Sequence, residues 1–324
     1  MAFAGMTADA HHRLGPGREF DLVRAMLARW GDVAQGIGDD AASLVVPPGE
    51  RLVVSTDASV EGAHFRREWL TPEEIGWRAA ASALSDLAAM AARPLGMVIA
   101  MALPDVWRAD ALAIADGIGA VARATGTPIV GGDLVRASEL GLTITVLGSA
   151  VRPVGRDGAR VGDAVYVTGM LGGPRVALRA WERGEVPSAE ARARFARPMP
   201  RIAEARWLAE RGARALVDVS DGLGADVRHV AAASGVRIVL ERRLVPCLAG
   251  ASPADALAGG EEYELAVAAP PGLDVEAFAA RFGVALRRVG EVVADAAGAA
   301  GQVEIRGDDG ARVEFPSGHD HFSG

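Results

Sequence analysis

Short apolar runs alternate with longer amphipathic segments along this chain, and the alternation predicts strands and helices in turn. In residues 18–30 the side chains of Phe20, Val23 and Trp30 recur at helical spacing, and Gly31 would end that helix. Further helices are predicted at 71–92, 108–125 and 223–233. Strands are predicted at 43–46, 51–56, 97–103, 128–130, 142–147, 164–168, 215–219, 236–240 and 264–268. The recurrence of strand, helix and strand favours an α/β (α+β) sandwich over a helical bundle.

The second predicted helix has a clear start and a carboxylate inside it. Thr71 is a suitable N-cap, Pro72 suits the first turn, and Glu74 would close a capping box. Asp86 lies among alanine and leucine positions that would be buried, and a buried carboxylate is costly unless it is paired or metal-bound. The alternative is a solvated Asp86 at the edge of the helix.

Turn formers and charged residues gather at 150–162 and predict a domain boundary there. We expect a flexible arm over residues 1–16, an N-terminal domain over 17–150 and a C-terminal domain over 151–324. A chain of 324 residues, of which 50% are hydrophobic, is ample for two domains with cores of their own.

Composition excludes several classes of protein. The net charge of −8 argues against binding to nucleic acid or to a membrane surface. We expect no signal peptide and no transmembrane segment, and the single Cys247 permits no internal disulfide, which suits a cytoplasmic protein. All 34 basic residues are arginine. A P-loop and Schiff-base chemistry both need lysine, so both are excluded.

Several segments would bring oxygen ligands to one place. Ser55, Thr56 and Asp57 follow a short apolar run, so they would lie where a strand emerges from its sheet. Other aspartates stand beside small residues in a similar way: Asp39, Asp40, Asp86, Asp133, Asp218 and Asp221. Two like charges about 4 Å apart repel by about 4 kcal/mol at an effective dielectric near 20. Such a group would therefore need cations, and Mg²⁺ suits carboxylate and phosphate oxygens. The alternative is that each aspartate serves a turn or an N-cap.

Other candidate residues have equally ordinary explanations. Glycines at 36–38 and 131–132 predict loops whose backbone N–H groups could approach phosphate oxygens, although a tight turn explains them as well. His64 could contact a substrate or be a satisfied core histidine. Arg136 and Arg156 could bind phosphate, but most arginines of this chain must be solvated surface.

Six motifs occur in order along the chain: G-I-G-D-D-A-A, S-T-D-A-S-V-E-G-A-H-F, A-L-S-D-L-A-A-M-A-A-R-P, G-G-D-L-V-R, D-V-S-D-G-L-G-A-D and G-G-E-E-Y-E-L. In this order and spacing they resemble the thiamine-monophosphate kinases, a family of the aminoimidazole-ribotide-synthetase-like superfamily, over residues 17–323. The resemblance implies the two-domain fold of that superfamily and a homodimer formed through the N-terminal sheet. It also implies that ATP and several Mg²⁺ ions bind between the domains.

The resemblance further implies roles for single residues. Metal ligands would be Asp40, Ser55, Thr56, Asp57, Asp86, Asp133, Asp218 and Asp221. Nucleotide contacts would come from Gly132, Asp133, Arg156 and Ser220. Substrate contacts would come from His64, Glu261 and His319, the last of which stands where relatives have an aromatic residue. The chain also departs from the family at Ala83, Leu134, Val135 and Glu262, where relatives have Asn, Thr, Thr and Asp.

The implied function is direct in-line transfer of the γ-phosphoryl group of ATP to the phosphate of thiamine monophosphate. The acceptor is an anionic oxygen at neutral pH, so the aspartates would be metal ligands and not general bases. One alternative is another ATP-using enzyme of the superfamily, such as an amidine-forming cyclase, which would release inorganic phosphate. The other is a non-catalytic dimer that binds Mg²⁺ and nucleotide.

Overall fold

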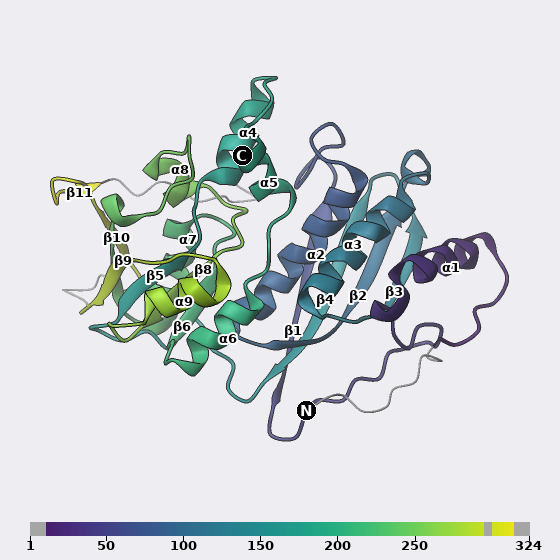
Figure 1. The fold of residues 1–324 in the computed structure, drawn as a ribbon, viewed down its shortest axis with the longest axis horizontal. Helices are drawn as coiled ribbons and strands as arrows, with labels where there is room; N and C mark the ends of the chain where they lie inside the picture. Colours follow the sequence, from purple (N-terminus) through teal and green to yellow (C-terminus); the bar gives the residue numbers. More distant parts are fainter. Residues whose placement is uncertain (1–10, 295–299, 314–324) are drawn as a thin grey trace. The chain divides into compact units, whose positions relative to one another are not determined.

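The structure is a computed structural model that describes residues 11–294 and 300–313. The chain folds as two compact units. The first unit contains the residues up to 87 together with 93–151, and the second contains 88–92 and the residues from 152 onwards. Each unit has a β-sheet and helices of its own (Figure 1). None of the described helices is both long and apolar enough to cross a membrane.

The first unit is built on a four-stranded sheet with the order β1-β4-β2-β3. Its strands are β1 (Arg51–Val60), β2 (Arg93–Leu103), β3 (Ile129–Arg136) and β4 (Gly141–Ala150). Its helices are α1 (Arg18–Trp30), α2 (Pro72–Ala89) and α3 (Ala111–Thr125), with short 3-10 turns at Gly31–Val33 and Asp105–Trp107. β4 pairs antiparallel with both β1 and β2, whereas β2 and β3 are parallel and are joined by the crossover helix α3.

Helix starts and ends in this unit follow the expected local chemistry. α1 occupies the predicted residues, and Gly31 follows it with φ 59°. The capping box predicted for α2 is confirmed. Thr71 Oγ1 accepts the N–H of Glu74 at 3.3 Å, and Glu74 Oε2 accepts the N–H of Thr71 at 2.9 Å.

Helices α2 and α3 lie side by side over the sheet (Figure 1) and touch through glycines. A Cβ atom placed on Gly76 would lie 2.0 Å from the carbonyl oxygen of Ile114. A Cβ atom placed on Gly117 would lie 1.9 Å from the carbonyl oxygen of Glu73. Any side chain at either position would therefore push the two helices apart.

The second unit has a seven-stranded sheet with the order β11-β10-β7-β9-β5-β8-β6. Its strands are β5 (Ala164–Thr168), β6 (Ala215–Asp218), β7 (Arg237–Glu241), β8 (Leu265–Ala269), β9 (Leu286–Val293), β10 (Val303–Arg306) and β11 (Arg312–Val313). Its helices are α4 (Gly173–Glu182), α5 (Ala189–Ala196), α6 (Ile202–Glu210), α7 (Leu223–Ser234), α8 (Pro253–Ala258) and α9 (Val275–Phe282), with a 3-10 turn at Arg242–Leu244. β5 and β8 are buried along their whole length, as expected of strands inside a covered sheet.

The core of the second unit fixes the place of one loop. Val217 of β6 and Val227 of α7 are both buried in the same apolar cluster. β6 ends at Asp218 and α7 begins at Leu223, so residues 219–222 connect a buried strand to a buried helix. The ends of this loop cannot move without disturbing the core.

Two strand predictions for the first unit are wrong. Residues 43–46 form neither helix nor strand, and Val45 is 84% exposed. β1 does not end at residue 56 but continues to Val60, because β4 pairs with it over its whole length, from Arg51 opposite Ala150 onwards.

Candidate functional site

Ser55, Thr56 and Asp57 lie in the interior of β1 and not at the end of a strand, which corrects the prediction. Successive side chains of a strand point to opposite faces, so Ser55 and Asp57 share one face and Thr56 lies on the other. Ser55 Oγ donates to Asp86 Oδ2 of α2 at 2.5 Å. Thr56 Oγ1 lies 3.0 Å from Thr145 Oγ1 of β4. The structure therefore brings two predicted metal ligands, Ser55 and Asp86, into direct contact.

A cavity of about 380 Å³ lies within the first unit. Two predicted site segments line it, with Asp39 and Asp40 from one and Gly132 and Asp133 from the other. Much of the remaining wall is apolar and comes from α1, β2 and β3: Phe20, Val23, Met26, Trp30, Val98, Ile99, Met101 and Val130. The cavity thus combines an acidic side with an apolar wall.

The glycines next to Asp133 are part of β3, which corrects the predicted loop at 131–132. A Cβ atom on Gly132 would lie 2.2 Å from the carbonyl oxygen of Ile99, so the close approach of β2 requires glycine here. Asp133 pairs with Ala100 in the β2–β3 ladder. Its backbone is therefore fixed by the sheet, while the residue lines the cavity.

The other predicted glycine loop has the expected conformation. Gly36 and Gly38 have φ of 64° and 117°, values that side-chain-bearing residues rarely adopt. The carbonyl oxygen of Ile37 accepts the N–H of His12 at 3.0 Å. Asp39 and Asp40 follow directly, so the loop leads into the acidic side of the cavity.

In the second unit, Asp218 ends β6, and the loop between β6 and α7 carries Ser220 and Asp221. The N–H groups of Ser220, Asp221 and Gly222 all donate to Oδ2 of Asp226, at 3.0, 3.1 and 3.1 Å. Burial raises the pKa of the Asp226 carboxyl to about 8, and the charges of Asp218 and Asp221 act in the same direction. Three acidic side chains are thus close together in one short stretch.

The predicted substrate residue Glu261 lies against the same loop. Its N–H donates to the carbonyl oxygen of Ser220 at 2.7 Å, and the N–H of Tyr263 donates to that of Val219 at 2.9 Å. Glu261 and Tyr263 have φ of 66° and 52°, a conformation that is costly for residues with a Cβ atom. Tyr263 Oη donates to Glu261 Oε2 at 2.6 Å. The surrounding contacts hold this segment in a strained shape.

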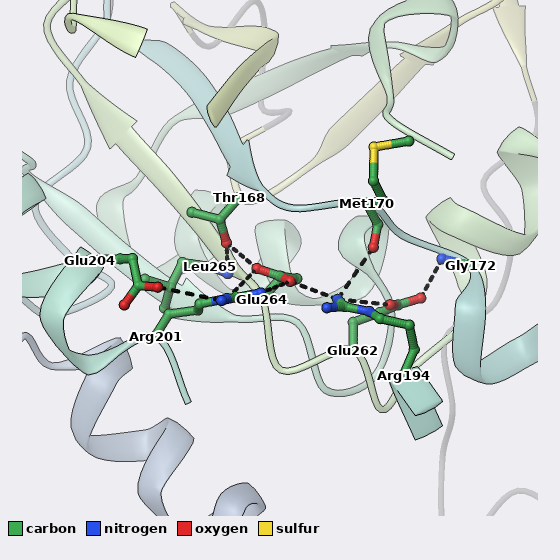
Figure 2. A network of polar contacts seen from close by, with 9 residues as sticks. All are labelled: Thr168, Met170, Gly172, Arg194, Arg201, Glu204, Glu262, Glu264 and Leu265. Carbon is green, nitrogen blue, oxygen red and sulfur yellow. Dashed lines mark hydrogen bonds and ion pairs between the residues drawn. The ribbon is translucent and has the colours of Figure 1, made fainter. Parts of the chain in front are cut away.

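Figure 2 shows the buried ionic network that anchors this segment. The carboxylate of Glu264 accepts two hydrogen bonds from Arg201, at 2.6 and 2.8 Å, one from Arg194 at 2.6 Å and one from Thr168 Oγ1 at 2.5 Å. Burial acts to raise the pKa of Glu264, but the charges of Arg201 and Arg194 outweigh it and lower the pKa below its usual value. Glu264 therefore remains ionised and ties the start of β8 to the helices that follow α4.

Glu262, two residues earlier, has a different environment in the same view (Figure 2). Its Oε1 accepts the N–H of Gly172, just before α4. Its Oε2 has no hydrogen-bond partner among the described residues and lies 3.9 Å from an Nη atom of Arg194. Burial raises the pKa of Glu262 to about 8, against the charge of Arg194 and the Gly172 N–H, while the charge of Glu264 adds to the rise.

The structure gathers the predicted metal ligands only in part. Within residues 11–294 and 300–313, no group of three or more His, Cys, Asp or Glu side chains is arranged to hold a metal ion. Asp40 and Asp133 line one cavity, and Ser55 contacts Asp86. The meeting of all eight predicted ligands stays a prediction.

Three other predicted contacts also stay predictions. His64 is partly exposed in the turn after β1, where its Nδ1 accepts the N–H of Val60 at 3.2 Å. Arg156 is exposed, and its carbonyl oxygen accepts a hydrogen bond from Ser234 Oγ at 2.8 Å. His319 lies outside the described residues.

Sequence reasoning missed Asp226 and the network around Glu264. A signal for Asp226 was present, because it ends the D-V-S-D-G-L-G-A-D motif in the first turn of a helix, where a carboxylate can accept N–H groups. Glu264 offered no such signal, since its partner Arg201 is 63 residues away in the chain.

The sequence matches two family models, "AIR synthase related protein, N-terminal domain" over residues 38–150 and "AIR synthase related protein, C-terminal domain" over residues 160–301. The chain therefore belongs to the AIR synthase related proteins, and the predicted two-domain α/β fold is confirmed.

Comparison with individual proteins identifies the family within the AIR synthase related proteins more closely. The thiamine-monophosphate kinase of Mycobacterium tuberculosis is 39% identical over 247 residues, which cover 72% of this chain and 74% of that protein. The crystal structure of thiamine-monophosphate kinase from Stenotrophomonas maltophilia K279a is 33% identical, with a TM-score of 0.79 over 94% of this chain and 100% of that chain. The structure of AaThiL complexed with AMPPCP and TMP is 30% identical, with a TM-score of 0.73 over 94% of this chain and 96% of that chain. The chain is a member of the thiamine-monophosphate kinase family.

Proposed function

We propose that this chain phosphorylates thiamine monophosphate to thiamine diphosphate, by direct in-line transfer of the γ-phosphoryl group of ATP. The observation that carries the proposal is the cavity of the first unit, which combines an apolar wall with acidic segments from two family motifs. The names of the relatives support the same reaction, and one of their structures contains AMPPCP and TMP.

The cavity suits a nucleotide. Its apolar wall, with Phe20 and Trp30 of α1, would hold a base. Gly132 lines the cavity without a side chain, so its backbone would lie next to the phosphate oxygens. In the second unit, Ser220 and the exposed Arg156 would contact the nucleotide as well. The absence of lysine means that the cationic side chains on the phosphates would all be arginine.

The donor chemistry of the site fits Mg²⁺, which prefers carboxylate and hydroxyl oxygens. The residues that would hold it are Asp40, Ser55, Thr56, Asp57, Asp86, Asp133, Asp218 and Asp221. Bound Mg²⁺ would neutralise charge on the transferring phosphoryl group. The contact between Ser55 and Asp86 supports the assignment, because it already places a hydroxyl and a carboxylate oxygen 2.5 Å apart.

The acceptor would be held by the strained segment of the second unit together with His64. Glu261 is held by its N–H bond to Ser220 and by the hydroxyl of Tyr263, so its carboxylate has a defined position. The acceptor phosphate is anionic at neutral pH, so transfer needs alignment of two repelling phosphates and no general base. His319 would complete the substrate contacts.

We further propose a homodimer formed through the sheet of the first unit. Leu52 and Val54, on the edge strand β1, are 51% and 54% exposed. Edge strands with exposed apolar residues favour association with another chain. Analytical ultracentrifugation should give a dimer for the wild type and a monomer for Val54→Glu; a monomeric wild type would refute the dimer.

The proposed reaction is tested by incubating the purified chain with Mg²⁺ and ATP, with and without thiamine monophosphate, and separating the products by chromatography. Thiamine diphosphate and ADP should form only when both substrates and Mg²⁺ are present. Release of inorganic phosphate alone would reassign the chain to a cyclase-like reaction. Binding of Mg²⁺–ATP without any turnover would indicate a non-catalytic protein.

A further inference from the structure

The carboxylate of Asp226 is buried and accepts three hydrogen bonds beside the site, yet none of the predicted contacts involves this residue. It lies in the first turn of α7 and is 2% exposed. One of its oxygens, Oδ2, accepts hydrogen bonds from the N–H groups of Ser220, Asp221 and Gly222, which are consecutive residues. The N–H of Asp226 in turn donates to the carbonyl oxygen of Gly222 at 3.0 Å.

This arrangement fixes the loop from one side. An oxygen that accepts three successive N–H groups defines the curvature of the backbone around it. Gly222 permits the curvature, with φ 117°, and a Cβ atom there would lie 2.9 Å from the backbone of Ala258. The loop is therefore confined between Asp226 and α8.

The segment that carries Glu261 fixes the loop from the other side. The carbonyl oxygen of Ser220 accepts the N–H of Glu261, and that of Val219 accepts the N–H groups of Glu262 and Tyr263. The N–H groups of Ser220, Asp221 and Gly222 thus face Asp226, while the carbonyl groups of Val219 and Ser220 face residues 261–263. A change at Asp226 would therefore affect both the loop at 219–222 and the segment at 261–263.

We infer that Asp226 is a positioning residue that holds Asp218, Ser220 and Asp221 in the arrangement needed to bind Mg²⁺ and nucleotide, and that it acts through the loop backbone without being a ligand itself. The inference rests on the proposed function. A positioning role can be told apart from a ligand role by substitution with asparagine. An asparagine can replace Asp226 as a hydrogen-bond acceptor, whereas it cannot replace a carboxylate that binds the metal ion.

The experiment compares Asp226→Asn, Asp226→Ala and Asp221→Asn in the full chain, with His229→Ala, an exposed change on the same helix, as the control. Hydrogen exchange of the amides of residues 219–222 is measured without ligand. Binding of Mn²⁺ is measured by electron paramagnetic resonance, with and without a non-hydrolysable ATP analogue.

We expect Asp226→Asn to keep the amide protection and to bind Mn²⁺ with the analogue within about threefold of the wild type, because its amide oxygen can accept the same N–H groups. Asp226→Ala should lose protection in this loop and weaken Mn²⁺ binding by about tenfold to a hundredfold, the usual effect of losing a residue that orients metal ligands. Asp221→Asn should weaken binding but keep the protection. His229→Ala should change neither.

The outcomes separate the inference from the proposed function. If Asp226→Asn weakens Mn²⁺ binding as much as Asp226→Ala does while keeping the protection, Asp226 is a ligand and the inference is wrong. If Asp226→Ala leaves both protection and binding unchanged, the loop does not depend on Asp226. A wild type that binds Mn²⁺ and the analogue but does not phosphorylate thiamine monophosphate would refute the proposed reaction and leave the inference standing.

Discussion

The replacement Glu262→Gln should change how the stability of the protein depends on pH. Glu262 is buried, its Oε1 accepts the N–H of Gly172, and its Oε2 has no hydrogen-bond partner among the described residues. Burial is the main reason why its pKa is raised from 4.5 to about 8, and Arg194 only partly opposes it. Between about pH 4.5 and pH 8, the folded protein therefore keeps a proton on Glu262 that the unfolded chain has already lost.

The sign and size of the effect follow from the difference in proton binding. Because the pKa is raised in the folded state, the contribution of Glu262 is fully present below about pH 4.5 and is lost as the pH rises towards 8. At 1.36 kcal/mol per pKa unit, the difference between 4.5 and about 8 sets a ceiling of about 5 kcal/mol. Between pH 5 and pH 8 the loss should be on the order of 3 kcal/mol. Glutamine is neutral throughout and keeps an acceptor for Gly172, so this loss should disappear.

The assay is urea unfolding at 25 °C between pH 5 and pH 8.5, followed by circular dichroism and tryptophan fluorescence. The free energy of unfolding of Glu262→Gln, minus that of the wild type, should increase by about 3 kcal/mol from pH 5 to pH 8. Glu185→Gln, at an exposed glutamate, serves as the control and should follow the wild type. An equal difference between Glu262→Gln and the wild type at every pH would refute the argument, because Glu262 would then bind protons alike in both states.

Other perturbations test the site and the core beside it. Asp57→Asn should lower the rate of thiamine diphosphate formation by about a hundredfold or more with an unchanged circular dichroism spectrum, since a lost ligand misplaces the phosphates; a folded variant with the wild-type rate would contradict the ligand assignment. Arg201→Met should destabilise the chain by about 3–5 kcal/mol in urea, because it leaves the charge of Glu264 poorly compensated. Gly132→Ala should cost about 1–3 kcal/mol, since the new methyl group meets the carbonyl oxygen of Ile99; a stability equal to that of the wild type would mean that β2 and β3 adjust freely. Removal of divalent metal with EDTA should abolish turnover, and added Mg²⁺ should restore it.

Local signals were sufficient to predict several elements. The helix at 18–30 was predictable because its apolar spacing and Gly31 agree, and the start of α2 was predictable because Thr71 and Glu74 cap each other. The acidic segments at Asp40 and Asp133 were recognisable from their glycines, and both line the cavity.

Features that depend on distant partners were not predictable in the same way. Polar residues suggested that β1 ends near Asp57, but pairing with β4 outweighs that local preference and extends the strand to Val60. Gly132 suggested a loop, yet glycine is required at this position because the backbone of Ile99, in the neighbouring strand β2, lies too close for a side chain. Glu264 and its arginines meet only after the second unit has folded, so no local pattern marks them.

The glycine contacts between α2 and α3 also limit how this sequence can evolve. Gly76 and Gly117 each face a backbone oxygen at about 2 Å from where a Cβ atom would stand, so no other amino acid can replace either of them while the helices keep their spacing. Most core positions accept another apolar amino acid of similar volume, but at these two positions every other amino acid is too large. In a library of single substitutions selected for growth, both sites should therefore be almost invariant, although neither contacts the cavity.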